Sequence, residues 1–398
     1  MDLTIIPGLL RGSVCAIPSK SQAHRLLICA AFADDTTQLL CPETNQDIEA
    51  TADCLRSLGA AIERTEDSYW ITPVKQFPES TTLNCRESGS TLRFMLPIAG
   101  ALGINTTFIL SGRLPQRPLA PLWGEMERMG CKLSRPTENT IQCTGRLSSG
   151  NYRISGSVSS QFITGLLFAT ALLPGSSQLI IPDKLESKPY VDMTQAALKL
   201  FGVHSENLAC SFSLPFHSPG KINVEGDWSN GAFFLAAQQL GSKVTVKNLD
   251  PDSTQGDKAV LECLNLLRSN CTIDVADIPD LVPILSIVAA ANKGASFTNI
   301  QRLRLKESDR VEAICNMLAA LGISTQADNS TLTVFPGKIK GGTVDSASDH
   351  RIAMTAAIAA TIASGPVRIL NAQCVNKSYP AFWQEYENLG GQYEQYIR

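Results

Sequence analysis

Positively charged side chains recur at places where a polar segment opens an apolar one. Lys20, Arg25, Arg93 and Arg351 each lie in or near the first turn of a predicted helix. A cation at that end opposes the helix dipole, at a cost of roughly 0.3–1 kcal/mol each. An anion bound there would turn this cost into a gain, because free backbone N–H groups and the cations would both face negative charge. Together the four predict a multiply anionic ligand, whereas any one alone would suit a solvated cation or an ion pair.

Other polar groups fit the same interpretation. Ser159-Ser160-Gln161 opens an apolar helix with two hydroxyls and an amide, which suit both helix capping and donation to phosphate oxygens. Four more cations lie in polar segments flanked by apolar ones: Arg117, Lys306, Arg310 and Lys377. The run Lys306-Glu307 with Arg310 is equally typical of an ordinary ion-pair cluster at a helix start.

A repeated unit should position these side chains. It consists of a polar opening, an apolar helix, a β-branched strand, a loop and a second helix, and it recurs about every 70 residues with one shorter interval. Six copies are predicted, three in each half of the chain. Their openings are Ser19-Lys20-Ser21, Glu87-Ser88-Gly89-Ser90, Ser159-Ser160-Gln161, Asp227-Trp228-Ser229, Pro279-Asp280 and Asp349-His350-Arg351.

The ends of the units support the repeat. Gly59, Gly130, Gly202, Gly322 and Gly390 each follow a large apolar residue, where a helix C-terminus favours a left-handed residue. The fourth copy lacks this ending. The first helix of each unit is nearly all apolar, which predicts burial on every side, with the strands forming sheets outside it. The alternative is a generic α/β array whose similar spacing is accidental.

Composition narrows the class of protein. The chain has 398 residues, 44% apolar and 18% charged, which predicts a globular protein of two domains. A net charge of −3 gives no general attraction to nucleic acid or to an anionic membrane. The twelve cysteines form no metal-ligand pattern with the four histidines, so we expect reduced thiols in a cytosolic protein. The first residues do not resemble a secretory signal, and apolar stretches such as 281–291 are too short to span a bilayer.

Eight segments from Lys20 to Pro380 resemble, in order, the substrate motifs of the 5-enolpyruvylshikimate-3-phosphate synthases. The most specific is Leu303-Arg304-Leu305-Lys306-Glu307-Ser308-Asp309-Arg310. The others are Ser19 to Arg25, Ser88 to Arg93, Arg117-Pro118, Ser159-Ser160-Gln161, Ser187 to Tyr190, Ile278-Pro279-Asp280, and Asp349-His350-Arg351 with Lys377 to Pro380. The chain departs from residues often found in the family at His24, Glu87, Ser90, Phe94 and Arg302, so no contact is assigned to Arg302 and inhibitor sensitivity is left open.

The resemblance implies a substrate pair and residues for each substrate. It assigns to shikimate 3-phosphate Lys20, Ser21, Arg25, Ser159, Ser160, Gln161, Ser187, Tyr190, Asp280 and Lys306. It assigns to phosphoenolpyruvate Lys20, Gly89, Arg93, Arg117, Gln161, Arg310, Arg351 and Lys377. Asp280 and Glu307 are expected to be the carboxylates of the proton transfers, with Lys20 and Lys306 beside them as cationic partners or donors. Neither a metal nor an organic cofactor is expected.

The implied fold is an α/β (α+β) inside-out barrel of two domains, each with three βαβαββ-type units, buried helices and outer sheets. One domain is expected to span 19–226 and the other 1–18 with 227–398, with the active site in the cleft between them. The implied activity transfers enolpyruvyl from phosphoenolpyruvate to shikimate 3-phosphate, on the route to chorismate and aromatic amino acids. A cytoplasmic monomer without nucleic-acid or membrane partners is expected.

Two other interpretations were weighed. The related enzymes that transfer enolpyruvyl to a UDP-linked amino sugar typically have Lys-Asn in the first motif and a reactive cysteine before Arg-Pro. This chain has Lys20-Ser21 there, and Ser111 to Gln116 contains no cysteine. A non-catalytic anion-binding scaffold would have no need of Asp280 and Glu307 among its cations, and the chain shows no basic–aromatic interleaving of the kind that stacks bases.

Overall fold

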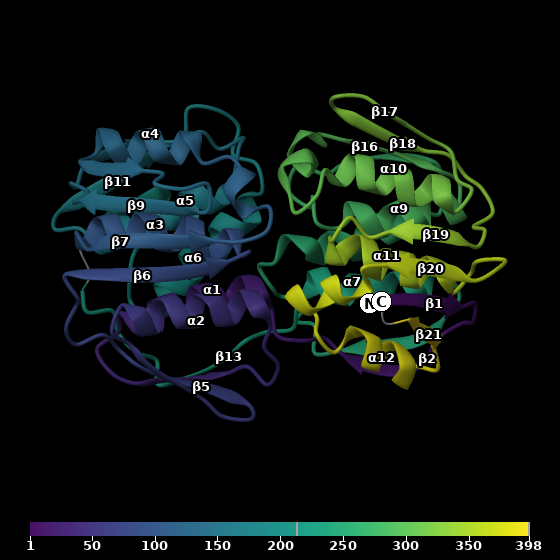
Figure 1. Cartoon of the computed structure of the whole chain (residues 1–398), viewed down its shortest axis with the longest axis horizontal. Helices are drawn as coiled ribbons and strands as arrows, with labels where there is room; N and C mark the ends of the chain where they lie inside the picture. The colour runs from purple at the N-terminus through teal and green to yellow at the C-terminus, as the bar shows by residue number, and fades with distance from the viewer. Residues whose placement is uncertain (212–213, 397–398) are drawn as a thin grey trace. The chain divides into compact units, whose positions relative to one another are not determined.

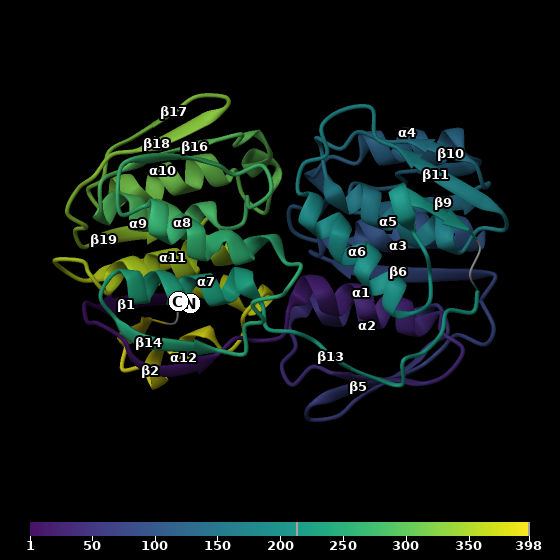
Figure 2. The same ribbon diagram turned by 180° about the vertical axis from the view of Figure 1, so that it is seen from behind.

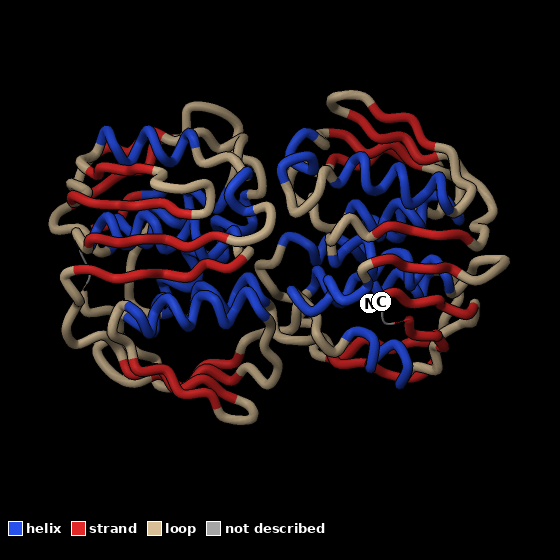
Figure 3. The backbone as a smooth tube through the Cα atoms, in the orientation of Figure 1, coloured by secondary structure: helices blue, strands red, loops and turns tan. Residues whose placement is uncertain are grey.

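The computed structural model describes residues 1–211 and 214–396, which form two compact units. One is continuous, Pro18–Val224, and the other combines Met1–Ile17 with Glu225–Arg398. The architecture is the predicted two-domain inside-out α/β fold. Each unit consists of helices between separate outer sheets (Figure 3).

The unit Pro18–Val224 contains three copies of the repeat. Its helices are α1 (Lys20–Ala31), α2 (Gln46–Ser57), α3 (Gly89–Leu102), α4 (Ala120–Arg128), α5 (Ser160–Ala171) and α6 (Lys188–Leu200), with the 3₁₀ turns η1 (Leu114–Gln116) and η2 (Glu206–Leu208). Its strands are β3 (Thr37–Leu40), β4 (Ala61–Arg64), β5 (Ser68–Thr72), β6 (Ser80–Arg86), β7 (Asn105–Leu110), β8 (Cys131–Ser134), β9 (Thr140–Gly145), β10 (Asn151–Arg153), β11 (Ser176–Ile180), β12 (Ala209–Ser211) and β13 (Lys221–Asn223).

Its sheets repeat one pattern of pairing. Their strand orders are β13-β3-β5-β4, β6-β7-β9-β8 and β10-β11-β12. Each contains one parallel pair, β13 with β3, β6 with β7 and β10 with β11, and its other pairs are antiparallel. Figure 1 shows β6, β7 and β9 on one face of this unit, and Figure 2, from behind, shows α5 and α6 on the other.

The second unit contains the other three copies. Its helices are α7 (Trp228–Gln239), α8 (Val260–Leu266), α9 (Val282–Ala291), α10 (Arg310–Ala320), α11 (His350–Ala360) and α12 (Phe382–Asn388), with η3 (Gly256–Ala259), η4 (Gln301–Leu305) and η5 (Ala372–Lys377). Its strands are β1 (Asp2–Ile6), β2 (Arg11–Cys15), β14 (Lys243–Lys247), β15 (Cys271–Asp274), β16 (Ala295–Thr298), β17 (Thr325–Ala327), β18 (Thr331–Val334), β19 (Gly342–Asp345), β20 (Val367–Leu370) and β21 (Gln392–Tyr396).

The sheets of this unit explain the short interval of the repeat. Their orders are β19-β20-β1-β21, β15-β16-β18-β17 and β14-β2. In the fully described segment 227–280 no antiparallel hairpin follows α8, and β14 pairs only in parallel with β2. The fourth copy is therefore shorter because it lacks the two strands that complete the sheet in the fifth.

Local chemistry explains where the helices begin, end and lie. The five glycines predicted to end helices have positive φ, from 77° at Gly202 to 115° at Gly130, as expected of left-handed residues after a helix. The first helices of the units are buried as predicted. In α9 every residue from Val282 to Ala290 is buried, and in α11 all eleven residues are. These helices form the core and carry the candidate site at their N-termini.

Candidate active site

In the unit Pro18–Val224, three predicted openings are the N-termini of helices packed in the core. Ser19, Ser88 and Ser159 cap α1, α3 and α5, and each hydroxyl accepts a backbone N–H of the first turn. A cap of this kind satisfies only some of the N–H groups that a helix start leaves without intrahelical partners. Helices α3 and α5 pack together, and α6 packs against both α1 and α5. The N-termini of α1, α3 and α5 thus position side chains that can bind an anion.

One group of predicted residues surrounds Gly89. The Arg93 guanidinium, 3% exposed, donates from Nη1 to Gln161 Oε1 at 3.0 Å and to the Gly89 carbonyl at 3.4 Å. Its Nη2 donates to the Pro118 carbonyl at 3.3 Å. A Cβ at Gly89 would lie 2.5 Å from a terminal nitrogen of Arg93 and equally close to one of Arg117. The structure therefore brings together four residues assigned to phosphoenolpyruvate.

A second group in this unit is organised by Arg25, which is 2% exposed. Its Nε donates to Thr194 Oγ1 at 2.9 Å, and its Nη1 to the Ser21 carbonyl at 2.6 Å. Its Nη2 donates to the Tyr190 carbonyl at 2.8 Å and to Thr164 Oγ1 at 3.3 Å. Burial lowers the pKa of Arg25 to about 10, so the side chain stays charged at neutral pH. Arg25 thus links Ser21 and Tyr190, two residues assigned to shikimate 3-phosphate.

Helix α5 joins the two groups, because Gln161 reaches Arg93 while Thr164, one turn later, reaches Arg25. Ser187 lies beside the second group in a left-handed conformation, with φ of 52°, and its carbonyl accepts the Tyr190 N–H. Lys20, in the first turn of α1, forms an ion pair of 2.9 Å with Asp47 from α2. The residues predicted in this half therefore lie at the starts of these helices or beside them, and Lys20 adds a cation at the start of α1.

In the other unit the centre is Arg310, the first residue of α10, which is 1% exposed. Its guanidinium donates to three carboxylates, at 2.6 Å to Asp280, 2.6 Å to Glu307 and 2.8 Å to Asp349. These acids come from three places in the chain, the loop before α9, the turn before α10 and the N-cap of α11. Hydrogen bonds to three carboxylates hold the Arg310 guanidinium in one orientation, because this planar group points its N–H bonds in fixed directions.

Asp280 is also bound by two further cations. Lys306 Nζ lies 3.3 Å from Asp280 Oδ1, and Arg351 Nη2 donates to Asp280 Oδ2 at 3.1 Å. Burial opposes ionisation of this carboxyl, but Arg351, Lys306 and Arg310 outweigh burial and hold its pKa well below the ordinary value. Removal from water lowers the pKa of the Lys306 ammonium to about 8, despite the opposing charge of Asp280. The cluster thus combines a carboxylate held in its ionised form with an ammonium ion whose pKa is lowered toward neutrality.

The structure brings together five predicted residues here: Asp280, Lys306, Glu307, Arg310 and Arg351. The ion-pair interpretation of Lys306-Glu307 with Arg310 is correct as far as it goes. However, the cluster also includes Asp280 and Asp349, which no surface helix pair would bury. The sixth predicted residue, Lys377, is the last residue of η5, which packs against α11.

Three acids that the sequence analysis did not assign as site residues lie in or near these clusters: Asp47, Asp257 and Asp349. Asp349 had a local signal, since an aspartate at the opening of an apolar helix is a typical N-cap. It accepts the Arg351 N–H at 3.0 Å and the Arg310 guanidinium with the same carboxylate. Asp47 and Asp257 had none, because each meets its partners only through tertiary packing.

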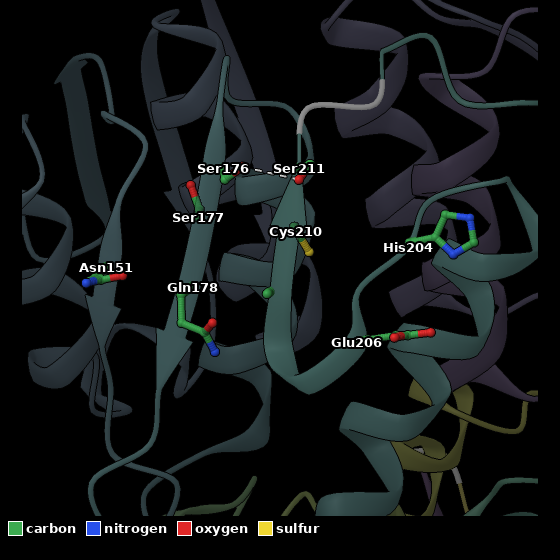
Figure 4. Close-up of a pocket in the computed structure, with 9 residues that line it drawn as sticks. Asn151, Ser176, Ser177, Gln178, His204, Glu206, Cys210 and Ser211 are labelled. Carbon is green, nitrogen blue, oxygen red and sulfur yellow. Dashed lines mark hydrogen bonds between the residues drawn. The ribbon is translucent and has the colours of Figure 1, made fainter.

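A surface depression in the unit Pro18–Val224 lies away from the predicted site residues. It has a volume of about 680 Å³ and lies over β11 and β12, where Gln178, His204 and Glu206 contribute to its lining (Figure 4). None of the predicted site residues lines it. In the described ranges no group of three or more His, Cys, Asp and Glu side chains could hold a metal ion, and no helix is long and apolar enough to cross a membrane. The twelve cysteines, all described, form no disulfide.

Comparison with known proteins identifies the family. The family model described as EPSP synthase (3-phosphoshikimate 1-carboxyvinyltransferase) matches residues 6–386. The chain belongs to the EPSP synthase family. The 3-phosphoshikimate 1-carboxyvinyltransferase of Clostridium novyi (strain NT) is 38% identical over 425 residues, covering 98% of each chain. The protein of the same name from Clostridium kluyveri is 38% identical over 422 residues, covering 99% of this chain and 98% of that one.

Solved structures show the same fold. An EPSP synthase from Acinetobacter baumannii, described at 2.37 Å, superposes with a TM-score of 0.81 at 24% identity and covers 99% of this chain and 100% of that one. A second structure of an EPSP synthase from that organism also gives a TM-score of 0.81. The EPSP synthase family consists of transferases, so the resemblance drawn from the eight segments is confirmed at the level of family and fold.

Proposed function

We propose that this protein transfers the enolpyruvyl (1-carboxyvinyl) group of phosphoenolpyruvate to the 5-hydroxyl of shikimate 3-phosphate. The products are 5-enolpyruvylshikimate 3-phosphate and phosphate, on the shikimate pathway to chorismate and aromatic amino acids. Membership of the EPSP synthase family supports the reaction, and the carboxylate–cation cluster around Asp280 is the observation that carries it. We further propose that the cations of both units act on the same substrate pair, and that the enzyme is a cytoplasmic monomer.

The chemistry is an addition followed by an elimination. In the addition, a base takes the proton of the 5-hydroxyl, its oxygen bonds to the central carbon of phosphoenolpyruvate, and an acid protonates the methylene carbon. In the elimination, a methyl proton is removed, the double bond re-forms and phosphate leaves with its bonding electrons. The reaction therefore needs two proton-transfer groups and fixed positive charge for both phosphates and the carboxylate, and every one of these group types is among the predicted residues.

We assign the hydroxyl base to Asp280. Its three cations keep Asp280 ionised in the free protein, and the ionised form is the one that a base needs. The same cations lower its pKa and so make it a weaker base. All three of these cations, Arg351, Lys306 and Arg310, are also assigned to the substrates. Substrate anions would draw positive charge away from Asp280 and raise its pKa, so the carboxylate would become more basic once both substrates are bound. Glu307, which accepts a hydrogen bond from Arg310, is then assigned to the carbon-centred proton transfer.

Phosphate release tests the proposed activity. The protein should release phosphate from phosphoenolpyruvate when shikimate 3-phosphate is present and not when UDP-N-acetylglucosamine replaces it. Release with the UDP-sugar alone would support the sister activity, and no release with either would support an anion-binding scaffold. Size-exclusion chromatography with light scattering should give the mass of a single chain.

The pKa of Lys306 predicts an alkaline limit of activity. The side chain should be needed as the ammonium ion, and its pKa of about 8 means that kcat/KM falls as pH rises above 8. An arginine keeps its charge throughout this range, so Lys306→Arg should move the decline to higher pH. Lys338→Arg, a change at an exposed lysine, is the control and should leave the profile unaltered. A decline at the same pH in Lys306→Arg would assign it to another group.

Gly89 predicts a second effect, on phosphoenolpyruvate binding. In Gly89→Ala the new methyl group would displace the guanidinium ends of Arg93 and Arg117, which are flexible, rather than backbone. The fold should survive, while KM for phosphoenolpyruvate should rise by about tenfold, equivalent to ~1.4 kcal/mol. Gly124→Ala is the matched control, since a Cβ there meets nothing within 4 Å. Steady-state kinetics with each substrate varied separately would check this, and an unchanged KM for phosphoenolpyruvate would contradict it.

A further inference from the structure

Asp257 is a buried carboxyl near the catalytic cluster. It lies in η3, which packs against α7, and is 2% exposed. The neighbouring Gln255 fixes this turn to the start of α7, accepting the Trp228 N–H at 3.1 Å and donating to the Gly226 carbonyl at 2.8 Å. The Gln255 side chain therefore fixes the turn that carries Asp257 to the start of α7.

The two oxygens of Asp257 differ. The Ser229 hydroxyl donates to Oδ2, whereas Oδ1 is buried and has no hydrogen-bond partner within residues 1–211 and 214–396. In the same part of the chain Asp257 forms no ion pair. An ionised carboxylate in this setting would leave part of its charge uncompensated, and a protonated one would not.

Three charged groups act on Asp257. Asp280 from the loop before α9 and Asp227 from the N-cap of α7 disfavour its ionisation, while Arg351 from α11 favours it. Arg351 is already bound to Asp280 at 3.1 Å. Burial, followed by the charge of Asp280, raises the pKa of Asp257 to about 7. A pKa in this range lets the side chain change its protonation state near neutral pH.

We infer that Asp257 is a positioning residue which, while it holds a proton, leaves Arg351 to Asp280 and to the incoming anionic substrate. The inference rests on the proposed function, which assigns Arg351 to phosphoenolpyruvate. Ionised Asp257 would place a second carboxylate charge beside Asp280 and would compete with the substrate for Arg351. Binding of the anion and protonation of Asp257 therefore favour each other, as two linked binding events must.

The sign of the pH effect follows from this linkage. Below pH 7 Asp257 is neutral and phosphoenolpyruvate binds in its tighter mode. As pH rises through 7 the carboxyl ionises and KM for phosphoenolpyruvate should increase, by about fivefold or more for a coupling of ordinary strength. The pKa of Lys306 is lowered to about 8, so its titration adds a second effect at higher pH, and Asp257→Asn, which removes only the first effect, distinguishes the two.

Steady-state kinetics between pH 6 and 7.5 tests the inference. Asp257→Asn mimics the neutral carboxyl, so its KM for phosphoenolpyruvate should stay at the low-pH value of the unmodified protein throughout. Ser229→Ala removes the hydroxyl that stabilises the ionised form, so it should shift the rise in KM to higher pH. Asp252→Asn, an exposed change in the same loop, is the control and should keep the unmodified profile.

Each outcome decides a separate question. A rise in KM near pH 7 that persists in Asp257→Asn would overturn the inference, as would a high KM at every pH in that variant. If Asp257→Asn does not fold, the shift in Ser229→Ala decides alone, and an unmoved profile would overturn the inference. Failure of the proposed function would look different, since no variant and not even the unmodified protein would release phosphate.

Discussion

Replacement of Glu307 by glutamine should lower kcat by about 10²–10⁴-fold, the usual contribution of one positioned proton-transfer group. The amide keeps the size of the side chain and can still accept a hydrogen bond from Arg310, which now lies 2.6 Å from the Glu307 carboxylate. It cannot accept or deliver a proton at catalytic pH. The loss should therefore appear in kcat, with KM for either substrate changed much less, because the binding cations remain in place.

The design depends on a control close to Glu307 in the sequence. Glu312, in the first turn of α10, is exposed, so Glu312→Gln removes a carboxylate two residues from Arg310 without touching the cluster. It should retain kcat within about twofold and melt at a similar temperature. If Glu307→Gln kept turnover within a few-fold of the unmodified protein, its assignment to proton transfer would be wrong, and Glu307 would be left with the role of orienting Arg310.

The second large effect concerns stability. Asp349→Asn should destabilise the unit that contains it by about 3 kcal/mol, the lower end of what breaking a buried charge pair costs. Asp349 is fully buried and accepts from Arg310 at 2.8 Å. Asparagine caps helices as well as aspartate does, so the N-cap of α11 and its bond to the Arg351 N–H should survive. The expected loss is thus electrostatic, because Arg310 keeps its charge and loses one of three carboxylates.

A matched substitution separates the cap from the charge. Asp309 is the N-cap of α10 and pairs with Arg304 at 3.1 Å, but this pair is about one-third exposed. Asp309→Asn should therefore cost under ~1 kcal/mol, as exposed ion pairs do. Urea denaturation of both variants, followed by a probe in each unit, would give the comparison. Equal losses would show that burial of Asp349 adds nothing to its pairing with Arg310.

The sequence predicts local features of this fold and site better than tertiary ones. Ser159 as a cap, Gly202 as a helix end and the buried face of α9 follow from interactions within a few residues, and the structure confirms them. The shorter fourth interval was visible in the spacing, but a count of residues could not show that the hairpin after α8 is the missing part.

The ion-pair partners of the predicted cations could not be predicted from the local sequence. Lys20 pairs with Asp47 and Arg310 with Asp349, and each choice depends on how two helices pack rather than on either segment. The hydrogen bonds of Arg25 within the protein were likewise not predictable from the sequence. The resemblance assigns it to the substrate, and the structure adds that four of its hydrogen bonds go to Ser21, Thr164, Tyr190 and Thr194. A buried arginine with so many protein acceptors also shapes the backbone around it.

The unit that combines Met1–Ile17 with Glu225–Arg398 is discontinuous in the chain, which affects how it folds during synthesis on the ribosome. Strands β1 and β2 precede the unit Pro18–Val224 in the chain, whereas their neighbours β14, β20 and β21 follow it. Pro18–Val224 is continuous, and its strands pair only with one another, so it can complete its core during translation. Strands β1 and β2 must meanwhile remain without their sheet neighbours, with backbone N–H and C=O groups unpaired, until β14, β20 and β21 have been made.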